Sequence, residues 1–350
     1  MIKFDCDYLE GCHPAILDLL AKTNLEQTDG YGCDKYCENA RRLILKACGF
    51  TGKHGKNVPE IHFLVGGTQT NTTVIASILR PYQGVICAET GHINVHETGA
   101  IESTGHKVLA LPSKEGKLSA EQIEKCYSKH ANDCNYEHIV QPGMVYISFP
   151  TENGTIYSKK ELSDISRVCR KCGLPLFIDG ARLGYGLAAG GNDLTLPDIA
   201  SLCDVFYIGG TKIGALFGEA VVITNSLFKK DFRNMIKQRG GMLAKGRLLG
   251  IQFTALFSDG LYFRLARHAV DAAEKIKAAL EAKGVKFLFN SPTNQIFPIF
   301  SDETYEKLSK DFSFAFWEKT DSFHTAVRIC TSWATKDKDV DKLIEYLNRI

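Results

Sequence analysis

Three ionisable residues follow two short apolar runs and could converge on one ligand. The run at residues 175–178 ends at Asp179, and Arg182 follows three positions later. A second run, at 205–208, ends in Gly-Gly-Thr before Lys212. Apolar runs this short are typical of strands buried in a parallel sheet. Because open α/β sheets bind ligands at the carboxyl ends of their strands, we expect the three side chains to meet at one edge.

A third apolar run, at residues 61–65, leads into a segment that could hold a phosphate. Two glycines and Thr68 come directly after it, and residues of helical character follow. Glycines let the backbone approach a ligand closely, and the free N–H groups at a helix start attract anions. We therefore predict that Gly67, Thr68 and Gln69 bind a phosphate, although Gly-Gly-Thr is also common in plain strand–helix turns.

An amine, a carboxylate and a phosphate cradle are together what pyridoxal phosphate requires of a protein. Lys212 is flanked by glycines, a setting that suits an amine forming a Schiff base with the cofactor's aldehyde. Asp179 would keep the pyridine nitrogen protonated, so that the ring withdraws electrons. Arg182 would lie near the ring oxygen or near a substrate carboxylate, which its planar fork of donors suits.

Each of these residues also has a purely structural interpretation. A lysine at a strand end is commonly a surface residue, and an aspartate that ends a buried strand often caps the next helix. Arg182 could form an ion pair with Asp179 instead of contacting a ligand. Only the combination of the three features with the glycine-rich segment favours a cofactor.

The elements that must position these residues alternate between strand and helix. Further strands are expected at 84–88, 107–111, 144–149 and 220–224, and helices at 36–48, 72–79, 94–103, 119–129 and 159–172. Such alternation predicts an α/β fold with a largely parallel sheet covered by helices on both faces.

The chain of 350 residues exceeds the usual size of one hydrophobic core. A stretch dense in Lys, Arg and Gly at 225–250 indicates a boundary. We predict an N-terminal arm and helix at 1–30, a large cofactor-binding domain at 31–247 and a small C-terminal α+β domain at 248–350.

Composition excludes several classes of partner. With 42 basic and 40 acidic residues the net charge is only +2, too small a field to attract nucleic acid or an anionic membrane. The 12 cysteines are scattered and no secretory leader is evident, which predicts reduced thiols and a cytoplasmic location. Cys169 and Cys172 form a lone CxxC, which we interpret as two thiols on a helix, and we expect no metal site.

These motifs resemble those of the pyridoxal phosphate-dependent threonine aldolases. The shared features are DGAR at 179–182, Lys212 at a strand end, GGT at 66–68, HINVHETGA at 92–100 and YGCD at 31–34, in the family's order. The resemblance extends from the N-terminal arm to about Gly250. It implies a mostly parallel seven-stranded sheet of the aspartate-aminotransferase type (fold type I).

The resemblance also implies roles for residues that the pattern alone does not single out. His92 is expected to stack on the cofactor ring and to contact the substrate hydroxyl, whereas His96 is expected at the surface. Arg328, inside the strand-like segment 326–330, is similar to an arginine that binds the substrate carboxylate.

A homodimer or homotetramer with active sites at the subunit interface is a further implication. Tyr31 and a basic residue after the Gly-Gly-Met at 240–242 would reach the neighbouring site. The arginine that often follows this methionine is Leu243 here, which leaves Lys245 or Arg247 as substitutes.

Two more departures from the family pattern concern the reaction. The usual serine near the N-terminus, which helps to hold the substrate carboxylate, is Cys6. A histidine often present after the 144–149 strand is missing, with Thr151 and Glu152 nearby. The identity of the catalytic base therefore stays open.

The expected reaction is retro-aldol cleavage of L-threonine or L-allo-threonine, a small amino-acid substrate, to glycine and acetaldehyde. Arg328 and Arg182 would anchor the carboxylate, and His92, or a water that it positions, would remove the β-hydroxyl proton. The alternatives are a β-eliminating lyase or an aminotransferase acting on another amino acid. A catalytically silent binding or regulatory protein of the same fold is a third possibility.

Overall fold

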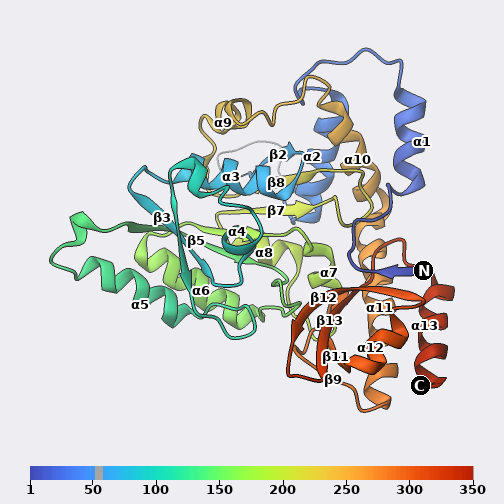
Figure 1. Ribbon diagram of the computed structural model, residues 1–350. Coiled ribbons are helices and arrows are strands. Elements are labelled where there is room, and N and C mark those ends of the chain that lie inside the picture. The colour runs from blue at the N-terminus through green and yellow to red at the C-terminus, as the bar shows by residue number, and fades with distance from the viewer. Residues whose placement is uncertain (52–57, 350) are drawn as a thin grey trace.

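The computed structural model describes residues 1–51 and 58–349, and its centre is a seven-stranded sheet (Figure 1). Strand β8 is antiparallel to both of its neighbours, and the strands from β7 to β4 are parallel to one another. The expected α/β fold with a mostly parallel sheet is thereby confirmed. In spatial order the strands are β2 (Glu60–Leu64), β8 (Glu219–Ile223), β7 (Val205–Gly209), β6 (Leu176–Asp179), β5 (Gln141–Ser148), β3 (Gln83–Ala88) and β4 (Lys107–Leu111).

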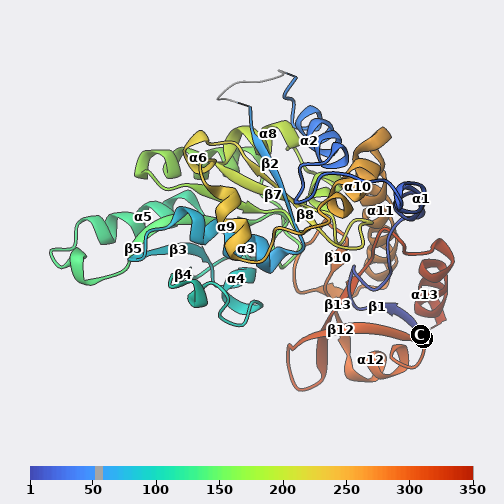
Figure 2. The ribbon, with the colours of Figure 1, turned by 90° about the horizontal axis from the view of Figure 1, so that it is seen from above.

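Helices cover both faces of this sheet, as the view from above shows (Figure 2). Successive residues of a strand face opposite sides, so Val145 joins one apolar cluster while Met144 and Tyr146 join the other. One face is covered by α2 (Lys35–Ala47), α5 (Ala120–Ala131), α6 (Lys159–Cys172), α7 (Leu183–Ala188), α8 (Leu196–Leu202) and α10 (Arg247–Phe257). The other face is covered by α3 (Gly67–Ile78), α4 (His92–Val95) and α9 (Phe232–Gln238).

The C-terminal part of the chain forms a second sheet with its own apolar core. The N-terminal arm contributes the edge strand of this sheet, because β1 pairs in parallel with β12, and both termini lie beside it (Figure 1). The elements are β1 (Ile2–Phe4), β9 (Lys286–Phe287), β10 (Gln295–Ile296), β11 (Pro298–Ser301), α12 (Asp302–Leu308), β12 (Phe312–Lys319), β13 (His324–Cys330) and α13 (Asp337–Arg349).

Two helices connect the two sheets and bear on where the domains divide. Helix α10 packs against α2 and against α1 (Pro14–Thr23). The first half of α11 (Leu261–Ala282) lies in the core of the large sheet and its second half in the core of the small one. The division after residue 247 stays a prediction, and these contacts favour grouping α10 with the large sheet.

Two local expectations were wrong. No continuous helix spans 94–103, because α4 ends at Val95 and only a short 3-10 turn, η1 (Glu102–Thr104), follows. Thr98 and Gly99 between them have φ of 51° and 70°, left-handed values that a right-handed helix cannot contain. Helix α3 begins at Gly67, well before residue 72, so the glycine-rich segment itself forms its first turn.

Local sequence features fix the backbone on both sides of strand β6, which carries Asp179 to the edge of the sheet. Helix α6 starts at a capping box in which the Ser158 and Glu161 side chains each bond the other's backbone N–H, and it ends at Gly173 with φ 66°. After β6, Gly180 and Gly209 lie where the ends of β6 and β7 cross, and a Cβ at either glycine would collide with backbone of the other segment. The two ends can therefore approach closely only because both residues are glycines.

No helix within residues 1–51 and 58–349 has both the length and the apolar character needed to cross a bilayer. All 12 cysteines are free thiols, and Cys169 and Cys172 both lie on α6 as expected.

Candidate active site

A cavity of about 320 Å³ opens at the edge of the large sheet where the parallel strands end. This volume lies in the range of about 300–1,000 Å³ that is usual for small-molecule sites. Most of its lining comes from the ends of the strands and the segments that follow them: Val65–Thr68 after β2, His92 after β3, Ser148 and Pro150–Glu152 at and after the end of β5, Asp179, Ala181 and Arg182 at and after the end of β6, Tyr207, Thr211 and Lys212 in and after β7, and Glu219 at the start of β8. Tyr8 of the N-terminal arm completes it.

Asp179 is buried in this cavity and is held by four donors. Its Oδ1 accepts hydrogen bonds from the Tyr207 hydroxyl (2.5 Å) and from Ala181 N (2.9 Å). Its Oδ2 accepts from the Tyr146 hydroxyl (2.6 Å) and from Asn71 Nδ2 (3.1 Å). Burial alone would raise the pKa of Asp179, but the charge of His92 and these hydrogen bonds lower it below its usual value. The alternative that Asp179 caps a helix is wrong, because α7 begins at Leu183 after Arg182 in the N-cap position.

His92 lies at the same cavity and is linked to Asp179 through two buried side chains. Its Nδ1 is 2.8 Å from Glu97 Oε1, and Asn71 Nδ2 donates both to this oxygen (2.7 Å) and to Asp179. Burial would lower the pKa of His92, but the bond to Glu97 and the charges of Asp179 and Glu97 raise it. His96 is exposed, as expected, and its ring centroid lies 5.6 Å from that of His92.

Lys212 contributes an amine without a partner to the cavity. Among the described residues, its Nζ has no hydrogen-bond or ion-pair partner, while its backbone oxygen accepts from the Tyr185 hydroxyl (2.5 Å). Burial, together with the charge of Arg182, lowers the pKa of the amine. A lowered pKa increases the fraction of neutral, nucleophilic amine at neutral pH.

Glu219 is a buried carboxyl group close to Lys212. Its Oε1 accepts from the Thr211 hydroxyl (2.8 Å) and its Oε2 from Gly210 N (3.1 Å). Burial and the charge of Asp179 raise the pKa of Glu219 to about 8, against the opposing effects of Thr211 and Lys212.

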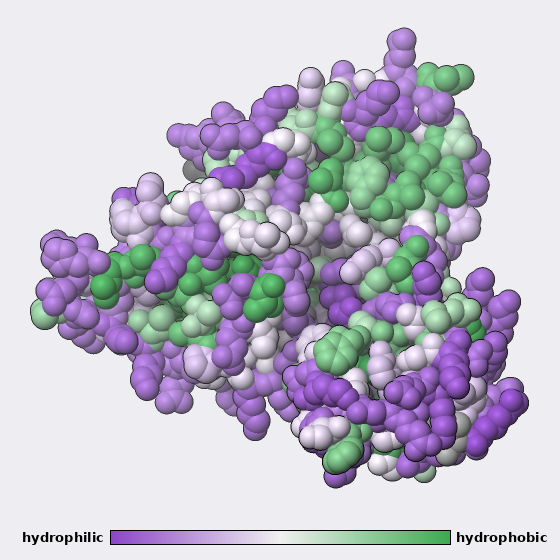
Figure 3. Space-filling view, in the orientation of Figure 1, coloured by the Kyte–Doolittle hydropathy of each residue, from purple (hydrophilic) through white to green (hydrophobic). Residues whose placement is uncertain are grey.

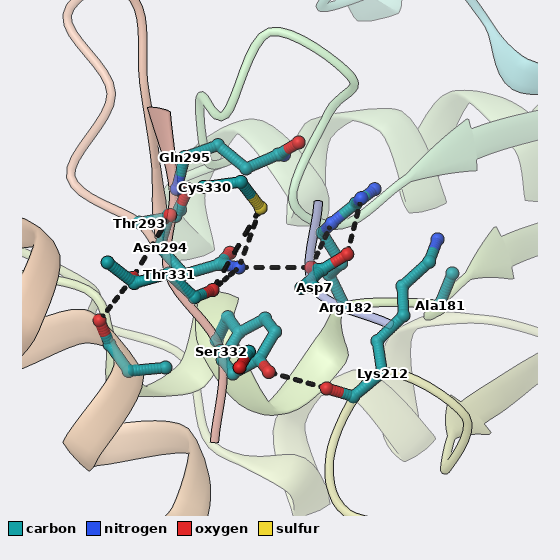
Figure 4. Close-up of polar contacts among 12 residues, drawn as sticks. Asp7, Ala181, Arg182, Lys212, Thr293, Asn294, Gln295, Cys330, Thr331 and Ser332 are labelled. Atoms are coloured by element: carbon teal, nitrogen blue, oxygen red, sulfur yellow. Dashed lines mark hydrogen bonds and ion pairs between the residues drawn. The ribbon is translucent and has the colours of Figure 1, made fainter. Parts of the chain in front are cut away.

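Arg182 pairs with Asp7, which corrects the expected alternative of an ion pair with Asp179. Arg182 Nε and Nη2 lie 2.7 Å and 2.9 Å from the two carboxylate oxygens of Asp7 (Figure 4). Asn294 Nδ2 of the small domain donates to the same carboxylate at 3.0 Å. Asp7 is fully buried, and although burial would raise its pKa, the charges of Arg182 and Lys212 lower it. Nη1 of Arg182 makes no hydrogen bond to any of the described residues and remains for a ligand.

The predicted phosphate segment lies at the cavity, but one of its side chains is turned away. Gly66, Gly67 and Thr68 line the wall, and the first amides of α3 have no carbonyl partner within the helix. A Cβ on Gly67 would lie 3.2 Å from the Tyr207 hydroxyl, so glycine keeps this wall clear. The Gln69 side chain instead accepts from Val65 N and donates to Arg239 O, which leaves only its backbone N–H for a phosphate.

Arg328 and Cys6 lie outside the set of residues that line the cavity. Arg328 Nη1 donates to Gln295 Oε1 (3.3 Å) and Nη2 to Asp5 O (3.0 Å), while its buried Nε has no partner among the described residues. Cys6 lines a different hollow, beside Cys330.

The residues expected to reach a neighbouring subunit are not among those that line this cavity. Tyr31 is exposed, and Lys237 Nζ lies 4.8 Å from the centre of its ring. Arg247 donates to Thr23 O and Glu26 O within the chain, whereas Lys245 is exposed.

Comparison with known proteins assigns the family. The model of the β-eliminating lyase family matches residues 11–303, most of the chain. This chain belongs to that family. It is therefore a lyase, of the pyridoxal phosphate-dependent group that includes the threonine aldolases.

Individual relatives agree with this assignment. A low specificity L-threonine aldolase of Pseudomonas sp. is 30% identical over 97% of this chain and 95% of its own length. A solved structure of Leishmania major threonine aldolase is 46% identical, covers 100% of this chain and 99% of its own, and has a TM-score of 0.95. Aspartate aminotransferase of Thermus thermophilus, 13% identical, has the same fold, with a TM-score of 0.71 over 100% of this chain and 91% of its own.

The residues present in this family member fit pyridoxal phosphate. A partnerless amine, an ionised carboxylate and a glycine-lined helix start all border one cavity of suitable size. Their chemical types match the aldehyde, the ring nitrogen and the phosphate of the cofactor.

Sequence reasoning missed most of the groups that hold these side chains. Asn71, Tyr146 and Tyr207 carry no motif, although the alternation of each strand would place its tyrosine on a defined face of the sheet. Asp7 stood in an arm without periodicity, and nothing in the chain around it indicated that Arg182 would be its partner.

We predict that Asp7→Asn destabilises the protein by about 3–5 kcal/mol, because it leaves the buried Arg182 charge without its partner. Because the pKa of Asp7 is lowered in the folded state, its contribution is present above about pH 4 and is lost as pH falls further. Urea unfolding measures the change. The surface Asp164→Asn variant, which loses contacts to Lys160 and Arg167, should be far less destabilising, and equal costs for both variants would contradict the prediction.

We also predict that Glu219→Gln stabilises the apoprotein at high pH. Folded Glu219 keeps its proton up to about pH 8 whereas the unfolded chain releases it near 4.5, so this group lowers stability as pH rises through that window. The variant should gain about 1–3 kcal/mol relative to wild type between pH 5 and pH 8. Denaturant unfolding at both pH values tests this, and a difference that does not change with pH would refute it.

Proposed function

We propose that this chain is a pyridoxal phosphate-dependent aldolase that cleaves L-threonine and L-allo-threonine to glycine and acetaldehyde. The observation that carries the proposal is the pairing, in one cavity, of the partnerless Lys212 amine with the ionised Asp179. The relative from Pseudomonas and the Leishmania structure, both named threonine aldolases, support it.

In this proposal the chain's own residues hold the cofactor at three points. Lys212 would supply the amine for the Schiff base, Asp179 would accept a hydrogen bond from the protonated ring nitrogen, and the amides of Gly67, Thr68 and Gln69 would receive the phosphate. The bound cofactor supplies an electron sink for the bond that breaks. His92, raised in pKa and fixed by Glu97, presents its other ring nitrogen as a hydrogen-bond donor at the cavity.

The substrate carboxylate would be bound from the side of the small domain. Arg182 is oriented by Asp7 and keeps Nη1 for this contact, a geometry that a flexible lysine would not provide. Arg328 and Cys6 come from elements beside the cavity, and we retain both as contacts for the carboxylate.

We further propose a homodimer or homotetramer whose active sites lie at the subunit interface. An apolar surface extends over α1 and α10 at the upper right of Figure 3. Leu17 of α1 is 52% exposed, and Leu25, which follows this helix, is 94% exposed. Burying such groups against a second copy of the chain would be favourable. Tyr31 and Lys245 remain candidates to reach the neighbouring site, and the free thiols support a cytoplasmic location.

The aldolase proposal predicts that purified protein loaded with pyridoxal phosphate releases acetaldehyde from L-threonine or L-allo-threonine. Reduction of the aldehyde by NADH in a coupled assay measures this. Ammonia and a keto acid in place of aldehyde and glycine would instead indicate β-elimination.

Lys212→Ala is the control for this assay. It should abolish both cleavage and the cofactor adduct that borohydride traps, because the amine is missing. An adduct that persists would assign the cofactor to another lysine.

The oligomer proposal predicts a solution mass of at least twice the 38.7 kDa of one chain. Light scattering measures this mass. Leu25→Asp, which places a charge at an exposed apolar position next to α1, should shift the protein toward monomer, and a wild type that is already monomeric would rule the interface out.

A further inference from the structure

One carboxyl group at the cavity has no part in holding the cofactor. Glu152 lies in the loop after β5, where the family often has a histidine and this chain has none. Its Oε1 accepts from the Ser148 hydroxyl (2.6 Å) and from His92 N (2.9 Å). Its Oε2 accepts no hydrogen bond from any other residue among 1–51 and 58–349, and the carboxylate's remaining contact is with its own backbone N–H. Two other residues thus fix one oxygen, and no other side chain bonds to the second.

The environment of Glu152 suits a proton acceptor. Burial and the charge of Asp179 raise its pKa above the usual value, while Ser148 and His92 oppose this shift. A carboxylate with a raised pKa is a stronger base than one in water. The titratable groups that interact with it from neighbouring elements are Cys87 of β3, His92 of α4, Tyr146 of β5, Asp179 of β6, and Tyr157.

The other ionisable groups at the cavity are less suited to accept a proton. Asp179 accepts four hydrogen bonds and has a lowered pKa. Both oxygens of Glu219 are bonded to the segment before Lys212. The raised pKa of His92 and the contact of its Nδ1 with Glu97 favour the protonated ring, so His92 is better suited to donate a hydrogen bond than to accept a proton.

We propose that Glu152 is the catalytic base for the cleavage, an inference that rests on the proposed aldolase function. The Oε2 atom of Glu152 accepts the proton of the substrate's β-hydroxyl as the Cα–Cβ bond breaks. The oxygen's electrons form the aldehyde C=O bond, and the electron pair of the broken bond remains with Cα. Cα then takes up one proton, and Glu152 releases the one that it received. The number of protons is therefore unchanged over the reaction. Ser148 is a positioning residue that orients the carboxylate.

The decisive variant is Glu152→Gln, which keeps an oxygen for the bonds from Ser148 and His92 N but cannot accept a proton. We expect kcat for L-threonine cleavage to fall about 10²–10⁴-fold. Glycine has no β-hydroxyl, so the spectral shift of the cofactor on adding glycine should be unchanged. Glu89→Gln, at a surface carboxylate that accepts from Ser113 N, is the matched control and should keep wild-type kcat.

Two further variants separate a catalytic role from a structural one. Glu152→His restores a base and should recover part of the activity with a different acidic limb in the pH profile of kcat. Ser148→Ala removes a bond to the ionised carboxylate and should move that limb to higher pH. Infrared titration of the apoprotein, with Glu152→Gln as reference, measures the pKa of this carboxyl group without any reaction.

The outcomes distinguish the two proposals. An inactive wild type would overturn the aldolase function and Glu152's role together. An active wild type with an equally active Glu152→Gln variant would overturn only the role of Glu152. Loss of the glycine-induced shift in Glu152→Gln would also count against it, because the residue would then support binding and not proton transfer. If Glu152→Gln does not fold, Glu152→His tests the proposal instead. A pH profile of kcat in Glu152→His that is the same as that of the wild type would then refute it.

Discussion

A carboxylate that stays ionised inside the protein is the constraint on which this site depends. Burying the charge of Asp179 without donors would cost several kcal/mol, or the group would take up a proton. Four donors prevent this, and they come from both strands that flank β6, from α3, and from the turn after β6 itself. The strand order β7-β6-β5 is what brings Tyr207 and Tyr146 to the two sides of this carboxylate. The ionised state of Asp179 therefore depends directly on the order of the strands in the sheet.

The charge of Asp179 also affects the pKa values of side chains that are linked to it through shared hydrogen-bond donors. Asn71 joins Asp179 to Glu97, and Glu97 in turn holds His92. The His92 backbone N–H fixes Glu152. The His92 ring lies among carboxylates on this path, so its charge lowers the pKa of Asp179 while Glu97 and Asp179 raise the pKa of His92. Acid–base chemistry at a single pH requires one group with a lowered pKa and another with a raised pKa in the same site.

A second buried pair, Asp7 with Arg182, ties the N-terminal arm to the large sheet. Asn294 connects the same carboxylate to the small domain, so three parts of the chain meet at one side chain. Buried ion pairs are weak sources of net stability, but breaking one is costly, and a bidentate contact fixes the direction of a guanidinium. The pair is better understood as orienting Arg182 than as holding the fold together.

The sequence by itself determined the strand–helix alternation, the polar residues that end β6 and β7, and the glycine-rich start of α3, because these are local patterns with a fixed period. From them the fold class and the cofactor could be predicted. Local patterns failed where the backbone leaves the standard regions, as at Thr98 and Gly99, which no periodicity reveals. Only the tertiary structure decided which side chains become partners. Asp7 and Arg182 are 175 positions apart and His92 and Glu152 are 60 apart, so their contacts depend on how the strands and the arm come together. Protonation follows from those contacts, since burial and neighbouring charge set a pKa and neither can be read from a residue's position in the chain.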